Sequence, residues 1–141
     1  MREIRLLVIH HSASSLQTTA KQIMGWHAAR FKLGIGYHRI IEADGGILDG
    51  RKVQRIGAHA KRSNTHSIGI CVVGDNTQTG REWTEHQERS LDITIRYYVK
   101  LYPDILVLGH RDTPGAATLC PGLDIAEWCK TRKIKARTLI I

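Results

Sequence analysis

The sequence has few cysteines and no long hydrophobic run. The first argues against a disulfide-stabilised protein, and the second against a signal peptide or a membrane-spanning segment. Its three cysteines, Cys71, Cys120 and Cys129, are too few and too odd in number for a disulfide framework. Reduced thiols favour a protein made in the cytosol. The apolar run near the N-terminus, residues 4–9, is too short for a signal-peptide core or a membrane span. We therefore expect synthesis in the cytoplasm without a leader, no membrane segment, and a monomer.

Internal repeats, low-complexity stretches and domain linkers are also missing from the sequence. Its 141 residues predict one domain, 1–141, with a basic and apolar tail over about residues 133–141. The last part of that tail, residues 138–141, is either a small extra strand or an unanchored end. A single domain of this length can bury a core without disulfides.

Acidic residues are in the minority, which indicates an anionic partner. Lys and Arg total 21 against 13 Asp and Glu, for a formal charge of +8 and a pI near 9.8. Such a surplus attracts nucleic-acid phosphates or the acidic polymers of a bacterial wall. Five of the cations fall between residues 130 and 137, so a solvated basic C-terminus is an equally simple interpretation. Zinc-finger spacing, a recognition helix and RNA-binding aromatic motifs are all lacking.

Three helices are predicted from capping residues and apolar spacing. Thr19 with Gln22 forms a capping box that opens a helix to about Phe31 and packs it on a sheet. Thr84 with Gln87 repeats the pattern and opens a longer helix. Pro103 ends that helix, and a short third helix is expected over residues 124–129.

Short apolar runs predict the strands that alternate with these helices. They cover residues 4–9, 36–41, 47–48, 53–56, 67–74 and 105–108, with an edge hairpin at residues 44–46. The run 67–74 is apolar almost throughout, so we expect it at the centre of the sheet. The order indicates an α/β (mixed) fold, with a central mixed sheet of about five to six strands flanked by helices.

Histidine and cysteine residues near two strand ends predict a metal site. His110 and Cys120 are joined by a loop of Thr, Pro, Gly and Ala that can return to one point. Imidazole and thiolate both suit Zn²⁺, and a catalytic site usually has three protein ligands. The third candidate is His10, which like His110 is expected just past the carboxyl end of a strand, where ligand sites gather in open α/β sheets. The pattern alone does not separate His10 from His11.

Four ordered blocks of the sequence, residues 8–13, 36–41, 59–74 and 109–124, resemble the zinc-dependent type 2 N-acetylmuramoyl-L-alanine amidases. The small lysozyme-like amidases of bacteriophages are most similar, and peptidoglycan recognition proteins are more distant. The resemblance implies an amidase/peptidoglycan-recognition-like fold and one Zn²⁺ per chain on His10, His110 and Cys120. It also implies hydrolysis of the bond between N-acetylmuramic acid and L-alanine, with bacterial peptidoglycan as partner.

The resemblance further suggests roles for five other residues. Tyr37 would orient the water or stabilise the oxyanion. Thr118 stands where the phage enzymes have a lysine, and its hydroxyl would donate a hydrogen bond that stabilises the transition state. Arg111 is a nearby cation that could share that task. His59 and Asn64 match polar groove positions that could hold the peptide stem or sugar. Other amidases of this fold have a glutamate base where this chain has Cys71, so the general base is not identified.

Two alternatives to an endolysin-like or wall-recycling amidase remain from the sequence. A peptidoglycan-binding module without catalysis would share the fold, but such relatives lack the thiolate that Cys120 supplies. A nucleic-acid or RNA polymerase-binding regulator is suggested by the basic charge. An amidase made without a leader would act on the cell wall after lysis or export, as a phage or prophage protein does.

Overall fold

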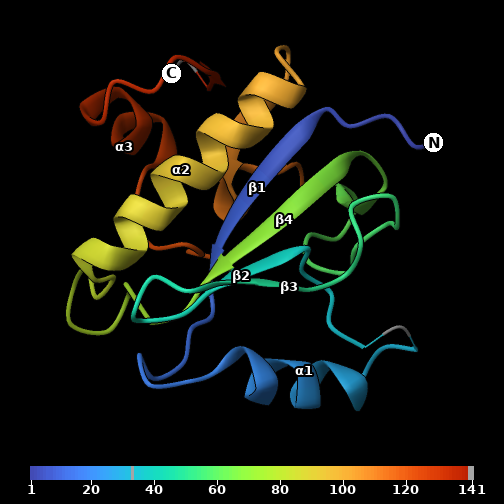
Figure 1. The fold of residues 1–141 in the computed structure, drawn as a ribbon, viewed down its shortest axis with the longest axis vertical. Coiled ribbons are helices and arrows are strands. Elements are labelled where there is room, and N and C mark those ends of the chain that lie inside the picture. The colour runs from blue at the N-terminus through green and yellow to red at the C-terminus, as the bar shows by residue number, and fades with distance from the viewer. Residues whose placement is uncertain (33, 140–141) are drawn as a thin grey trace.

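A six-stranded mixed sheet forms the centre of the computed structural model, which describes residues 1–32 and 34–139 (Figure 1). The strand order is β3-β2-β4-β1-β5-β6, and within the described residues only the β2–β3 hairpin is antiparallel. The expected mixed α/β fold is therefore confirmed, with β4 and β1 at the centre. The strands are β1 (Leu6–His11), β2 (Arg39–Ile41), β3 (Ile47–Asp49), β4 (Ser67–Val72), β5 (Leu106–Gly109) and β6 (Arg137–Thr138).

In the part of the chain that the structure describes, three α-helices flank the sheet: α1 (Ala20–Ala28), α2 (Glu85–Leu101) and α3 (Ile125–Thr131). Both predicted capping boxes are present, with the side chains of Thr19 and Thr84 accepting hydrogen bonds from the backbone N–H groups of Gln22 and Gln87. These helix starts were predictable because a capping box satisfies backbone donors within four residues. Among the helices of the described residues, none has the length and apolar character needed to cross a membrane.

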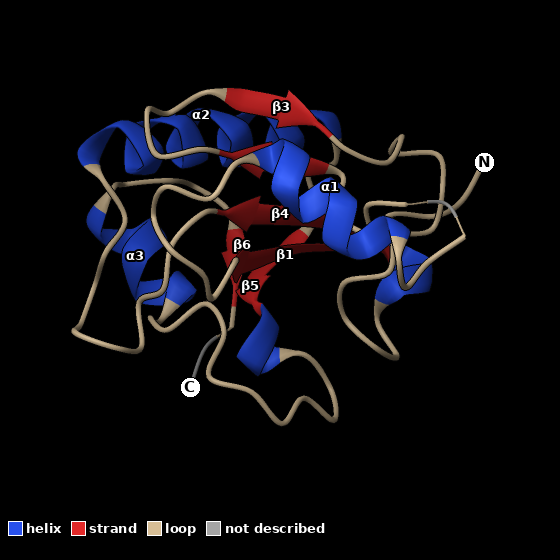
Figure 2. Ribbon diagram, turned by 90° about the horizontal axis from the view of Figure 1, so that it is seen from below, coloured by secondary structure: helices blue, strands red, loops and turns tan. Residues whose placement is uncertain are grey.

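The two faces of the sheet carry different helices. Leu7 and Ile9 of β1 face the main core with Leu91 and Ile95 of α2. Cys71 of β4 faces the opposite way, in a smaller cluster with two residues of α1, Ala20 and Ile23. Figure 2 shows α1 in front of β4 and β1. Because side chains alternate along a strand, His10 shares a face with its register partner Cys71. That face is the α1 side.

Helix α1 is shorter than the sequence predicted. It ends at Ala28 rather than near Phe31, and the Phe31 N–H donates to the carbonyl of His27. Only Ala20 and Ile23 of this helix are buried, whereas Trp26 is 50% exposed. The C-terminal half of α1 therefore lacks the packing on the sheet that would extend it.

Several strand predictions also need correction. Residues 53–56 form a turn instead of a strand, with the Arg55 N–H donating to the Lys52 carbonyl. Strand β2 begins only at Arg39, so residues 36–38 form a loop before it. At the C-terminus, β6 pairs in parallel with β5, so an extra strand does form, but it covers Arg137–Thr138 and Leu139 lies outside it. The remainder of that prediction, residues 140–141, lies outside the described residues.

Candidate metal centre

His10, His110 and Cys120 meet at one point beside the central strands. One ligand atom from each residue lies within 4.8 Å of the others. The register explains this, because Ile9 of β1 pairs with Gly109 of β5, so the next residue of each segment is a histidine. His110 begins a 3-10 turn directly after β5, as expected. His10, however, lies inside β1 rather than past its end, because β1 continues to pair with β4 as far as His11.

The loop that carries Cys120 is fastened to the turn after β5. The Arg111 N–H donates to the Cys120 carbonyl at 2.7 Å, and the Cys120 Sγ lies 3.7 Å from Nδ1 of His10. The Cys120 N–H donates to Oγ1 of Thr118 at 3.1 Å. Backbone contacts thus bring the thiol to the two imidazoles.

The structure separates His10 from His11, which the sequence alone did not. His11 points to the opposite face of β1, where its Nδ1 accepts a hydrogen bond from the Asn76 N–H at 3.1 Å. Its Nδ1 also lies 3.9 Å from a carboxylate oxygen of Asp75. His10 is fully enclosed and is the one that joins the ligand cluster.

Burial sets the protonation of the three candidate ligands. It lowers the pKa of His10 well below the usual range, and the neighbouring His59 and His110 lower it further. Burial also lowers the pKa of His110. Both imidazoles are therefore neutral at pH 7, the form that binds metal. Burial raises the pKa of the Cys120 thiol to about 12, so binding a metal would release a proton from this residue.

The donor set fits zinc. Two neutral imidazoles and one thiol, close enough to share an ion, are the ligand types and number found in catalytic zinc sites. Hard cations such as Mg²⁺ and Ca²⁺ prefer oxygen ligands instead. The cluster can therefore bind a borderline-soft metal ion.

Tyr37 lies beside the candidate ligands, in the loop before β2. Its ring lies edge-on to the His10 ring, with centroids 5.1 Å apart. Burial raises its pKa well above the usual range, and the neighbouring Cys71 and Cys120 raise it further. The hydroxyl thus keeps its proton at neutral pH and can donate a hydrogen bond. Cys71 is fully buried on β4, and burial raises the pKa of its thiol as well.

His59 and Asn64 lie in the loop that precedes β4. Both ring nitrogens of His59 have partners: Nδ1 is 2.9 Å from Nε2 of His10, and Nε2 is 3.1 Å from Oγ of Ser67. Oδ1 of Asn64 accepts hydrogen bonds from the N–H groups of His59 and Ala60, both at 2.9 Å. The structure thus brings His59 to the cluster, while the Asn64 side chain fixes the loop.

Thr118 and Arg111 flank the cysteine at the surface. Thr118 is exposed, and Arg111 is half-buried. Ser67 and Gly69 lie close to the His59 ring, and neither was predicted from the sequence as a site residue. A signal for Gly69 was present, because an isolated glycine inside an apolar strand often marks a close approach of another group.

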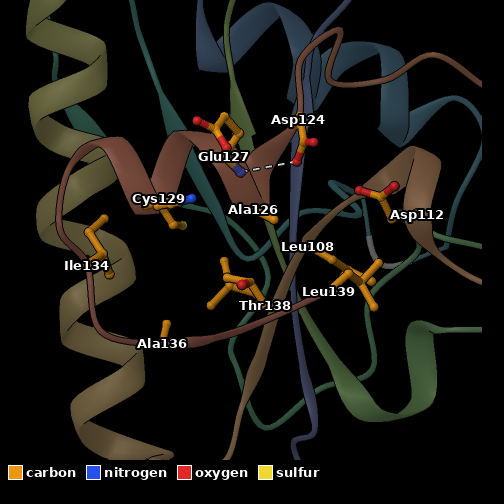
Figure 3. Close-up of a pocket in the computed structure, with 12 residues that line it drawn as sticks. Leu108, Asp112, Asp124, Ala126, Glu127, Cys129, Ile134, Ala136, Thr138 and Leu139 are labelled. Carbon is orange, nitrogen blue, oxygen red and sulfur yellow. Dashed lines mark hydrogen bonds between the residues drawn. The ribbon is translucent and has the colours of Figure 1, made fainter. Parts of the chain in front are cut away.

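A separate cavity of about 470 Å³ lies between α3, β5 and the C-terminal segment (Figure 3). Asp112, Asp124 and Glu127 line it together with apolar residues such as Leu108 and Leu139. None of the three candidate ligands lines this cavity. It is therefore a different feature from the metal centre.

Comparisons with known proteins agree on one family. Residues 1–123 match the family model described as N-acetylmuramoyl-L-alanine amidase. An endolysin of Enterobacteria phage K11 is 30% identical over 138 residues, covering 94% of this chain and 90% of that protein. The solved amidase LysC from Clostridium intestinale URNW is 29% identical with a TM-score of 0.83, covering 95% of this chain and 88% of that chain. A Drosophila PGRP-LB mutant in complex with tracheal cytotoxin is 27% identical with a TM-score of 0.75, covering 92% and 82%.

Proposed function

The chain belongs to the N-acetylmuramoyl-L-alanine amidase family, and on that premise we propose that its hydrolytic site is a zinc centre on His10, His110 and Cys120. The chain hydrolyses the amide bond between N-acetylmuramic acid and L-alanine in bacterial peptidoglycan. The observation that supports the zinc centre is the meeting of two imidazoles and a thiol within 4.8 Å. When bound, zinc supplies a more acidic water and polarises a carbonyl oxygen.

The residues around the ligands have separate tasks in this proposal. Burial keeps His10 and His110 neutral, so their lone pairs are free for a metal. The Tyr37 hydroxyl, protonated at neutral pH, donates a hydrogen bond to the oxygen on which negative charge develops. The exposed Thr118 donates a hydrogen bond that stabilises the transition state, and the Arg111 cation shares that task.

The substrate is proposed to lie along the α1 side of the sheet. This is the face that carries His10, and it also brings Tyr37 and His59 together. His59 and Asn64 border the place where a peptide stem or sugar would lie. A basic chain with charge +8 is attracted to the anionic wall that contains this substrate. We propose that one monomeric domain, residues 1–141, made in the cytoplasm, performs the reaction once it reaches the wall.

Hydrolysis is favoured over the two alternatives. A module that only binds peptidoglycan has no need for a buried thiol between two imidazoles. The similar proteins include endolysins, an amidase and peptidoglycan-recognition proteins, all of which are named for bacterial cell-wall chemistry.

The test measures new N-terminal alanine released from purified cell walls. Wild-type protein should release it, a chelator should stop the release, and added Zn²⁺ should restore it. Cys120→Ala should bind no zinc and release no alanine. The matched control is Cys129→Ala, which removes a buried thiol from α3, away from the ligand cluster. A Cys120→Ala protein that kept both zinc and activity would contradict the ligand assignment.

A further inference from the structure

Three side chains, connected by two hydrogen-bond contacts, lead from the candidate metal centre into the sheet. Nε2 of His10 is 2.9 Å from Nδ1 of His59, and Nε2 of His59 is 3.1 Å from Oγ of Ser67. Ser67 is fully buried at the start of β4. The three groups come from two strands and one loop, so the contacts depend on the folded chain.

The position of Cys120 indicates which ring nitrogen of His10, and then of His59, carries the proton. Its sulfur lies 3.7 Å from Nδ1 of His10, so Nδ1 is the nitrogen that faces the other ligands. A nitrogen that binds metal carries no proton, and therefore the neutral His10 ring has its proton on Nε2. His10 Nε2–H then donates to Nδ1 of His59. Because Nδ1 of His59 accepts this hydrogen bond, the neutral His59 ring carries its proton on Nε2. The His59 Nε2–H then donates to Oγ of Ser67.

The position of the His59 ring is set by its surroundings. Oδ1 of Asn64 accepts from the His59 backbone N–H and so fixes the start of the loop. Two glycines leave room for the ring: a β-carbon on Gly69 would lie 2.5 Å from Cγ of His59, and one on Gly57 would lie 2.7 Å from Cδ2. With both ring nitrogens engaged, neither is free for a substrate.

We propose that His59 is a positioning residue, which accepts the Nε2–H of His10 and holds that ring with Nδ1 turned toward the metal. This inference rests on the proposed zinc centre and adds a supporting residue to it. A hydrogen-bonded partner on the far nitrogen fixes both the tautomer and the orientation of a histidine ligand. Removing such a partner typically weakens metal affinity by about 10–100-fold.

Two substitutions of near-equal size separate this role from others. In His59→Asn the amide oxygen takes the place of Nδ1 and can still accept from His10. In His59→Gln the amide group takes the place of Nε2, so the contact with Ser67 can remain while the acceptor for His10 is lost. Zinc affinity is measured by competition with a chromophoric chelator, and Co²⁺-loaded protein is compared by visible absorption. Urea unfolding of the metal-free proteins shows that both variants fold.

The expected result is a loss of about 10–100-fold in zinc affinity for His59→Gln, with His59→Asn close to wild type. The Co²⁺ spectrum should change in the first variant only. Ser67→Ala, which leaves the His59 acceptor in place, should lose less affinity than His59→Gln. This variant also supports the test if His59→Gln proves too unstable to measure.

Three other results would overturn the inference. Equal zinc affinity in wild type and His59→Gln, with slower alanine release, would make His59 a substrate contact. Equal losses in His59→Asn and His59→Gln would show that the ring matters for its volume. A Ser67→Ala loss as large as that of His59→Gln would place the effect in β4 instead. A wild-type protein that binds no zinc would refute the zinc centre itself, which is a different outcome from all three.

Discussion

The Tyr37 ring lies edge-on to the ring of His10, with an angle of 61° between their planes. This contact places a partly buried phenol next to a candidate metal ligand. Cys71 and Cys120 are close enough to raise the Tyr37 pKa beyond the effect of burial. The hydroxyl therefore keeps its proton at neutral pH and can donate a hydrogen bond.

Tyr37→Phe should slow catalysis without releasing the metal. The ring and its contact with His10 remain, while the donor for the developing oxyanion is lost. We expect a fall of about 10²–10³ in kcat, the usual effect of removing one such donor, with unchanged zinc affinity. Tyr98→Phe is the matched control, because the Tyr98 hydroxyl is buried in the main core without a hydrogen-bond partner among the described residues. Unchanged kcat in Tyr37→Phe would remove this residue from the mechanism.

His10→Asn and His11→Asn should differ in metal content. The first replaces the proposed ligand nitrogen with an amide oxygen, a much poorer zinc ligand than imidazole, so zinc binding and alanine release should both be lost. The second leaves an amide oxygen where Nδ1 of His11 accepts from the Asn76 N–H, so zinc should stay bound. Metal analysis of the two purified proteins checks this. Zinc lost from His11→Asn and kept in His10→Asn would reverse the assignment.

Gly69→Ala should destabilise the protein and weaken zinc binding together. The new methyl group would overlap the His59 ring, and such overpacking typically costs about 1–3 kcal/mol. Gly25→Ala in α1 is the control, since a β-carbon there meets nothing within 4 Å. It should stabilise the protein by about 0.5–1 kcal/mol through helix propensity. Urea unfolding and chelator competition measure both effects, and a Gly69→Ala protein as stable as wild type would show that the ring can move aside.

Stability should fall as the pH drops from about 6.5 to about 4. His38 is fully buried, its Nδ1 accepts from the Gly69 N–H, and burial lowers its pKa to about 4. Above pH 6.5 the ring is neutral in both states. Between the two pKa values only the unfolded chain takes up the proton, so the folded state loses up to about 3 kcal/mol.

Urea unfolding of the metal-free protein across this pH range measures the loss. His38→Asn keeps an acceptor for the Gly69 N–H but cannot titrate, so its stability should change less with pH. His10 and His59 add to the loss in both proteins, because burial lowers their pKa values as well. Identical pH profiles for the two proteins would show that His38 has no part in the acid sensitivity.

The parts of the fold that depend on local contacts were predictable from the sequence. Thr19 and Thr84 cap their helices through residues three positions away, and the apolar run in β4 was correctly placed at the centre. Residues 53–56 looked like a strand but form a turn, where the Val53 carbonyl accepts from the distant Arg2 side chain. Their conformation depends on a contact 51 residues away, which periodicity does not reveal.

The three candidate metal ligands could also be predicted from the sequence, but the contacts that surround them could not. His10 and His110 each come at the end of an apolar run in the sequence. Because parallel neighbouring strands align their carboxyl ends, this shared position predicted that the two histidines would lie close together. The hydrogen bonds of His59 could not be read from the sequence. They require the loop before β4 to fold back over Gly69, and that depends on packing between segments.

The ligand set spans nearly the whole chain, from a strand close to the N-terminus to a loop at residue 120. A ribosome completes the third proposed ligand more than one hundred residues after the first. No nascent chain that stops before residue 120 can therefore assemble the zinc centre. The proposed wall-degrading activity is therefore absent during translation until residue 120 has been added and folded against β1 and β5.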